Sequence, residues 1–157
     1  EEVLIKNWPG LHIEPLQAPE NMEVLIGWTG SPASSPHFVS EVKRLKSDPS
    51  FYGDFLEDSH RCVEKLIHAF KTNNIKGVQK MVRQNRTIIQ RIDIETEKLK
   101  YLCDIAEKYH GASKTSGAGG GDCGITIINK DVDKEKIYDQ YTKHGIKPLK
   151  FNIYHGQ

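Results

Sequence analysis

The sequence predicts an α+β sandwich, in which helices pack on one face of a mainly antiparallel sheet. Short β-type runs occur near both ends of the chain, several amphipathic helical patterns follow one another between them, and strands and helices alternate unevenly. With 157 residues, the chain is long enough to bury one core and hardly two. We therefore expect a single domain.

Composition excludes several classes of protein. Apolar residues make up 37% of the chain and charged residues 27%, which is too apolar for a disordered protein and too polar for one that spans a membrane. The 22 basic residues nearly cancel the 21 acidic ones, so no overall charge favours nucleic acid or a membrane surface as a partner. Cys62, Cys103 and Cys123 lack metal-ligand spacing, which indicates reduced thiols and a cytoplasmic location.

The elements of the first quarter are short. Residues 3–5 and 11–13 are typical of β-type pieces separated by a Trp-Pro-Gly turn. Residues 23–28 form a continuous apolar run that is too short for a helix, and they predict a strand at the sheet centre. A helix is expected from Ser34 or Ser35 to about Lys46, because serine suits the cap and Pro36 the first turn.

Three further helices are predicted from residues that recur at steps of three and four. Asp48-Pro49, Asn73-Asn74 and Asp93 mark the breaks between them, and Gly111 is expected to end the last one in the left-handed conformation. The recurring positions are Leu56, His60, Val63, Ile67 and Phe70; Ile75, Val78, Val82, Ile89 and Ile92; and Leu99, Leu102, Cys103, Ala106 and Tyr109.

The chain closes on a helix and a strand. A helix is predicted from Val132 to about His144, with Gly145 as its stop, and alternation of Leu149, Phe151 and Ile153 with polar residues predicts a half-buried strand. Within residues 71–92 a basic helix face lies opposite an apolar one, with Lys76, Lys80, Arg83, Arg86 and Arg91. A solvated outer face is favoured there over steering of polyphosphate ligands, because no aromatic residue lies among the charges.

Six of the chain's 13 glycines fall within the fourteen residues 111–124. We expect residues 113–124 to form a loop that leads into a strand at residues 125–128. Successive glycines allow positive φ and close approach of a ligand, so their N–H groups can converge on phosphate. The segment lacks the Gly-Lys-Ser/Thr ending of a Walker A loop, and it precedes a strand where a dinucleotide fingerprint would open a helix.

Residues 114–123, Lys-Thr-Ser-Gly-Ala-Gly-Gly-Gly-Asp-Cys, resemble the third motif of the GHMP small-molecule kinase superfamily, which contains galactokinases, homoserine kinases, mevalonate kinases and phosphomevalonate kinases. Residues 8–11 and 27–35 are similar to the corresponding stretches of the bacterial phosphomevalonate kinase branch. The resemblance covers nearly the whole chain and corresponds to the C-terminal portion of such an enzyme.

The resemblance implies a ferredoxin-like sandwich over residues 21–157, with residues 1–20 as the join to an N-terminal domain outside this sequence. It implies transfer of the γ-phosphoryl group of ATP to 5-phosphomevalonate, which gives 5-diphosphomevalonate for isoprenoid synthesis by the mevalonate pathway. Mg²⁺ is implied as well, and ATP and Mg²⁺ are expected to bind mainly to the N-terminal domain.

The glycine-rich segment supplies most of the expected binding residues, and the sequence indicates no metal site and no catalytic residue. Asp122 is expected to stabilise the loop by accepting backbone N–H groups, since an unpaired carboxylate would repel phosphate. Ser31 and Ser34 lie before a helix start, where an anion is favoured, although an ordinary serine cap explains them equally well. The substrate- and phosphate-binding candidates are Lys114, Ser116, Gly117, Ala118, Gly119, Gly120, Gly121, Asp122, Ser31 and Ser34.

Other motifs of the superfamily are absent from these 157 residues. They are the second motif, of the Pro-x-x-x-Gly-Leu-Gly/Ser-Ser-Ser-Ala type, an N-terminal motif with a lysine, and an acidic catalytic residue. The chain also begins at Glu1 without Met, so we expect a piece cut from a longer protein and inactive alone. Two alternatives remain: another member of the superfamily such as a mevalonate kinase, or a non-catalytic small-molecule-binding or regulatory module.

Overall fold

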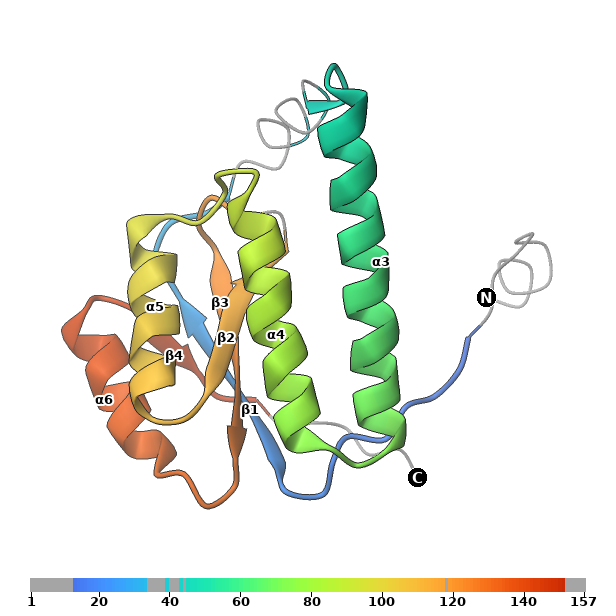
Figure 1. The fold of residues 1–157 in the computed structure, drawn as a ribbon. Coiled ribbons are helices and arrows are strands. Elements are labelled where there is room, and N and C mark those ends of the chain that lie inside the picture. Colours follow the sequence, from blue (N-terminus) through green and yellow to red (C-terminus); the bar gives the residue numbers. More distant parts are fainter. Residues whose placement is uncertain (1–12, 34–38, 40–42, 44, 118, 152–157) are drawn as a thin grey trace, which may run out of the picture.

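The structure is a computed structural model that describes residues 13–33, 39, 43, 45–117 and 119–151 (Figure 1). Residues 3–5, Ser34, Ala118 and most of the helix expected at 34–46 lie outside the described residues. In chain order the elements are β1 (Met22–Trp28), α3 (Pro49–Lys71), α4 (Ile75–Gln90), α5 (Glu97–Lys108), β2 (Ala112–Ser116), β3 (Cys123–Asn129), α6 (Lys134–Lys143) and β4 (Lys147–Leu149).

The strands form one four-stranded sheet in the order β2-β3-β1-β4, in which all neighbours are antiparallel. β1 pairs along its whole length with β3, from Met22 opposite Asn129 to Trp28 opposite Cys123, and its last residues pair with β4. This order, with helices between β1 and β2 and between β3 and β4, is the ferredoxin-like arrangement. The predicted α+β class and the central position of the first strand are confirmed.

The expectation that helices cover one face of the sheet is wrong in part. Successive side chains of a strand point to opposite faces, and Leu25 and Ile128 pack with residues of α5 and α6. Met22 and Ile127 point the other way and pack with residues of α3 and α4. Figure 1 shows the sheet between these two helix pairs. The α3–α4 hairpin therefore covers the second face of the sheet. The periodicity of a helix shows which of its own sides is apolar, but not which face of the sheet that side covers.

The predicted helix boundaries depend on local capping residues, and most are confirmed. Asp48 accepts a hydrogen bond from the Phe51 N–H at the start of α3, and Asn74 accepts one from the Gly77 N–H at the start of α4. After α5, however, His110 rather than Gly111 has positive φ, at 59°. Gly111 is needed for space instead, because a Cβ there would lie 3.0 Å from Ile128 Cγ2.

Two strands differ from the prediction. β2 occupies residues 112–116, which were expected to be part of a loop, and β4 ends at Leu149, where the last strand was expected to begin. β2 is polar and has two buried hydroxyls: Ser113 Oγ hydrogen-bonds Thr126 Oγ1, which lies 2.7 Å from the Tyr141 hydroxyl, whereas Thr115 Oγ1 has no partner among the described residues. The Ser113 hydrogen bond and the backbone pairing with β3 thus offset part of the cost of burying this polar strand.

The cysteines lie as predicted. Cys62 and Cys103 are free and buried, and Cys123 is free and half-buried. Burial raises the pKa of the Cys103 thiol to about 12, so it stays protonated as a small core side chain. Among the described helices, none is long and apolar enough to cross a membrane.

The Tyr141 hydroxyl provides a test of the buried polar network. Replacing Tyr141 by Phe removes the hydrogen bond to Thr126, and we expect the free energy of unfolding to fall by about 1 kcal/mol. Tyr138→Phe is a matched control on the same helix, because the Tyr138 hydroxyl has no hydrogen-bond partner among the described residues. Urea unfolding of the two variants measures the difference, and equal losses would contradict the network's role.

Candidate functional site

The glycine loop, defined here as residues 117–122, connects β2 to β3 at one end of the sheet. Trp28, Ser116 and Cys123 are paired across the three strands, so β1 ends beside the loop. The connection between α4 and α5 reaches the same end (Figure 1). Three segments distant in the sequence therefore meet around the glycines.

Backbone hydrogen bonds hold the loop on two sides. The Gly120 N–H donates to the Ile94 carbonyl at 2.7 Å, in the α4–α5 connection. The Asp122 N–H donates to the Ser31 carbonyl at 2.7 Å, and the Asp122 carbonyl accepts from the Thr29 N–H at 2.8 Å. The loop is consequently anchored both in its middle and at its end.

Glycines are required in the loop by conformation and by space. Gly117, Gly119, Gly120 and Gly121 all have positive φ. A Cβ on Gly119 would lie 2.7 Å from side-chain atoms of Ile94, and one on Gly121 would lie 2.7 Å from the Ser31 carbonyl oxygen. The close approach expected for a ligand is thus made first with the protein itself. The N–H groups of Gly119 and Gly121 donate to no described residue.

Ser31 lies beside the glycine loop, and its carbonyl rather than its hydroxyl makes the contact. The turn of residues 29–31 is closed by Thr29, whose buried hydroxyl donates to the Ser31 carbonyl at 3.3 Å and accepts from the Ser31 N–H at 3.5 Å. The exposed Ser31 side chain remains a candidate ligand contact. Ser34 and Ala118 lie outside the described residues, so their expected roles stay predictions.

Lys114 and Ser116 precede the loop on β2. The Lys114 ammonium is half-buried and donates to the Thr115 carbonyl at 2.7 Å, so its own strand holds it rather than the loop. Burial lowers the pKa of Lys114 below its ordinary value. Ser116 is half-buried at the last pair of the hairpin, opposite Cys123.

Asp122 stabilises the loop by a different route from the one expected. In the described part of the chain no N–H group donates to its exposed carboxylate, whereas its backbone N–H and carbonyl make the bonds to Ser31 and Thr29. Its φ is 56°, in the left-handed region that Asp tolerates better than most residues. The carboxylate is therefore presented beside the loop without a protein partner among the described residues.

Lys98 was not predicted as part of this end of the sheet. It lies in the first turn of α5, and its ammonium donates to the Thr29 carbonyl at 2.8 Å and the Gly145 carbonyl at 3.5 Å. It thus ties the turn after β1 to the turn before β4. Nothing local distinguishes it from the other basic residues among the 22 of the chain.

The basic face of α4 is not simply solvated, which corrects the favoured expectation for its arginines. Arg83 is paired with Glu107, Arg86 with Glu95, and Arg91, just after α4, with Asp58. Of the five basic residues on this face, Lys76 and Lys80 are exposed and have no ion-pair partner among the described residues. The arginines therefore join α4 to α3, to α5 and to the α4–α5 connection.

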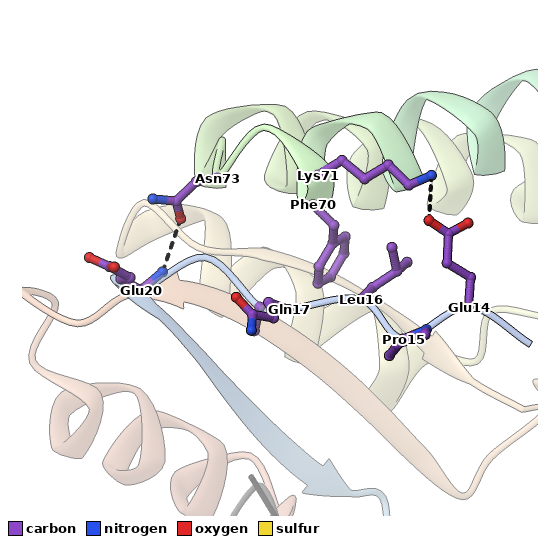
Figure 2. Close-up of a pocket in the computed structure, with 9 residues that line it drawn as sticks. Glu14, Pro15, Leu16, Gln17, Glu20, Phe70, Lys71 and Asn73 are labelled. Carbon is purple, nitrogen blue, oxygen red and sulfur yellow. Dashed lines mark hydrogen bonds and ion pairs between the residues drawn. The ribbon is translucent and has the colours of Figure 1, made fainter. Parts of the chain in front are cut away.

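A pocket of about 400 Å³ lies away from the glycine loop, between residues 14–20 and the end of α3 (Figure 2). Phe70 and Leu16 face each other in it, and the Lys71 ammonium is paired with Glu14 at 2.7 Å. The pocket is near the start of β1, whereas the loop is at the end of that strand. It contains none of the predicted binding residues.

No group of three or more His, Cys, Asp or Glu side chains that could hold a metal ion occurs in the part of the chain that the structure describes. Among the predicted site residues, Asp122 is the one with a carboxylate, a group that Mg²⁺ commonly binds, and this carboxylate is exposed near the glycine loop. Phosphate oxygens and other residues would have to complete such a site.

Comparisons with known proteins identify a family that matches about half of this chain, including the glycine loop. Residues 66–147, about half of the chain, match the family described as GHMP kinases C terminal. The phosphomevalonate kinase of Streptomyces sp. (strain CL190) is 33% identical over 151 residues, which are 90% of this chain and 40% of that protein. The mevalonate kinase of Bos taurus is less similar, 23% identical over 150 residues, with 90% of this chain and 37% of that protein covered.

Solved structures show the same relationship. The Lin0012 protein from Listeria innocua has a TM-score of 0.85 and 36% identity, over 92% of this chain and 42% of that one. The Streptococcus pneumoniae phosphomevalonate kinase in complex with phosphomevalonate and AMPPNP has a TM-score of 0.79 and 25% identity, over 95% of this chain and 44% of that one. The chain belongs to the GHMP kinase C-terminal family, and it spans about two fifths of the length of these relatives.

Two glycines with the same φ separate the backbone requirement from the packing requirement. Gly117 and Gly119 have φ of 82° and 81°, but a Cβ on Gly117 would meet nothing within 4 Å. We expect Gly119→Ala to lower the free energy of unfolding by about 1–3 kcal/mol more than Gly117→Ala does, because only Gly119 is packed against Ile94. Urea unfolding measures both. Equal losses would show that the loop does not depend on the Ile94 contact.

Proposed function

We propose that this chain is the C-terminal domain of a phosphomevalonate kinase, which transfers the γ-phosphoryl group of ATP to 5-phosphomevalonate. The observation that carries the proposal is the anchored glycine loop, in which the N–H groups of Gly119 and Gly121 donate to no described residue. Preorganised backbone donors of this kind suit phosphate oxygens. The similarity to the Streptomyces phosphomevalonate kinase supports the choice of substrate.

The loop would contribute positioning and charge stabilisation. In the reaction, the bond between the γ-phosphorus of ATP and its bridging oxygen breaks, a bond to a phosphate oxygen of 5-phosphomevalonate forms, and ADP leaves. Phosphoryl transfer depends on such stabilisation more than on covalent chemistry by the protein. N–H donors fixed by the Ile94 and Ser31 contacts need little rearrangement when charge shifts between the phosphates. Ser116, Ser31 and Lys114 are the nearby side chains that would assist.

ATP and Mg²⁺ would be bound mainly by sequence upstream of this chain. Asp122 is the carboxylate that this chain would bring near the phosphates. Mg²⁺ would neutralise phosphate charge during transfer. Bound Mg²⁺ would also reduce the repulsion between the Asp122 carboxylate and the phosphate oxygens.

The domain organisation follows from the same proposal. Residues 21–157 form the C-terminal domain, and residues 1–20 join it to an N-terminal domain that supplies the other motifs of the superfamily. Of this join, residues 13–20 are described, and Glu14 and Glu20 contact Lys71 and Asn73 at the end of α3. We expect no nucleic-acid or membrane partner, and the unpaired cysteines support a cytoplasmic location.

A mevalonate kinase is the second candidate, because bovine mevalonate kinase aligns over the same share of this chain at lower identity. The two candidates differ in whether the acceptor is a phosphate or a hydroxyl group. A non-catalytic binding or regulatory module is the third, and it would have no need of fixed phosphate donors in the loop.

The intact protein that contains this chain tests the proposal by ADP release with 5-phosphomevalonate or mevalonate as acceptor. We expect turnover with 5-phosphomevalonate, and a loss of about 100-fold in kcat for Gly120→Val, because a branched side chain is strained at φ 73° and displaces the loop. Gly53→Val is the matched control, since Gly53 lies on α3 and a Cβ added there would meet no atom within 4 Å.

Each contrary result has a separate meaning. Turnover with mevalonate alone would favour the second candidate, and no turnover with either acceptor would favour a non-catalytic module. Unchanged kinetics in a folded Gly120→Val variant would refute the role of the loop.

A further inference from the structure

The α4–α5 connection supplies the contact that holds the middle of the glycine loop. Ile94 is buried, its carbonyl accepts from the Gly120 N–H at 2.7 Å, and its side chain lies against Gly119. Asp93, directly before it, has φ of 50°, in the left-handed region that Asp tolerates better than most residues. The position of this connection therefore bears directly on the position of the loop.

The neighbouring residue, Glu95, is held by a bidentate ion pair. Arg86 Nε donates to Glu95 Oε1 at 2.6 Å, and Arg86 Nη2 donates to Glu95 Oε2 at 2.9 Å. Gln90 Nε2 adds a bond to Oε2 at 2.9 Å, and Asp104 Oδ1 lies 3.4 Å from Arg86 Nη2. Only 16% of the Arg86 side chain and 11% of the Glu95 side chain are exposed. A paired, largely buried carboxylate of this kind has little freedom to move.

The geometry connects this ion pair to the loop through one peptide unit. The Ile94 carbonyl and the Glu95 N–H belong to the same planar peptide group, so fixing Glu95 also limits the direction of the carbonyl that receives Gly120. The hydrogen bonds from Arg86 and Gln90 outweigh the effect of burial and keep the pKa of Glu95 below its ordinary value. The carboxylate therefore stays ionised, and the pair stays formed, at neutral pH.

We propose that Arg86 and Glu95 are positioning residues for phosphoryl transfer, which act on the glycine loop through Ile94 and touch no substrate. This inference rests on the proposed function of the loop. Its consequence is that loss of the ion pair moves the donors at Gly119 and Gly121 and lowers kcat, while substrate binding by the rest of the enzyme changes little. Small displacements of positioning groups have large effects on turnover.

A second arginine–glutamate pair of α4 serves as a control for the loss of an ion pair that does not reach the loop. Arg83 of α4 and Glu107 of α5 form a second, more exposed ion pair, in which Arg83 Nε alone donates to both carboxylate oxygens at 2.7 and 2.8 Å, and 41% of the Arg83 side chain and 40% of the Glu107 side chain are exposed. Arg83 also donates to the Gly111 carbonyl, before β2, and not to the α4–α5 connection. Glu107→Gln therefore removes a helix–helix ion pair without altering the support of Ile94.

The test compares Glu95→Gln, Arg86→Lys and Glu107→Gln in the intact protein. Glutamine keeps the shape of Glu95 without its charge, and lysine keeps the charge of Arg86 without the bidentate geometry. We expect the first two variants to speed hydrogen exchange of the Gly120 amide about tenfold and to lower kcat about tenfold, with less than about threefold change in KM for 5-phosphomevalonate. Glu107→Gln should change none of these. Arg86→Lys carries the test if Glu95→Gln does not fold.

Every other outcome overturns the inference. Unchanged exchange at Gly120 would show that the ion pair does not control the loop, whatever happens to kcat. Equal losses in Glu107→Gln would show a general effect on stability. Faster exchange with unchanged kcat would also overturn it, and Gly120→Val then separates the two proposals: if that variant still loses turnover, the loop's proposed function stands and only the positioning role fails.

Discussion

Two backbone carbonyls, those of Ile94 and Ser31, hold the glycine loop at the end of the sheet. Both contacts demand glycine, because a Cβ at Gly119 or Gly121 would occupy the space that Ile94 or Ser31 already fills. A loop with so many positive φ values would otherwise sample many conformations. The anchoring holds the loop in one arrangement, in which the N–H groups of Gly119 and Gly121 donate to no described residue.

The rest of the fold places those two carbonyls. β1 is one of the two inner strands, and its end carries the turn with Ser31, which Thr29 closes and Lys98 ties to the turn before β4. α4 and α5 lie against opposite faces of the sheet, so the connection between them passes over its end and brings Ile94 to the loop. A helix layer on each face thus has a consequence for the site as well as for the core.

Local signals were sufficient for most elements. The apolar run of β1, the periodicity of the helices and the capping residues Asp48 and Asn74 act within a few residues, so the sequence predicts them well. β2 could not be recognised, because the strand state of Ala-Ser-Lys-Thr-Ser depends on pairing with β3 and on the hydroxyls of Thr126 and Tyr141. The choice of sheet face by α3 and α4 likewise depends on contacts between segments that are distant in the sequence.

The candidate site shows the same division. The glycine-rich motif marks the loop, and the structure brings Ser31 to it, yet Lys98, Ile94 and the Arg86–Glu95 pair have no signature in the sequence. Helical periodicity alone places Arg86 on a solvated face, because its partners lie nine and eighteen residues away. Contacts between segments, rather than residue types, decide which charges support the loop.

The most direct measurement is a structure of the intact protein with 5-phosphomevalonate and a non-hydrolysable ATP analogue. We expect phosphate oxygens about 3 Å from the N–H groups of Gly119 or Gly121, with the hydrogen bonds from Gly120 to Ile94 and from Asp122 to Ser31 retained. Phosphates bound away from the loop, or a loop released from both carbonyls, would contradict it.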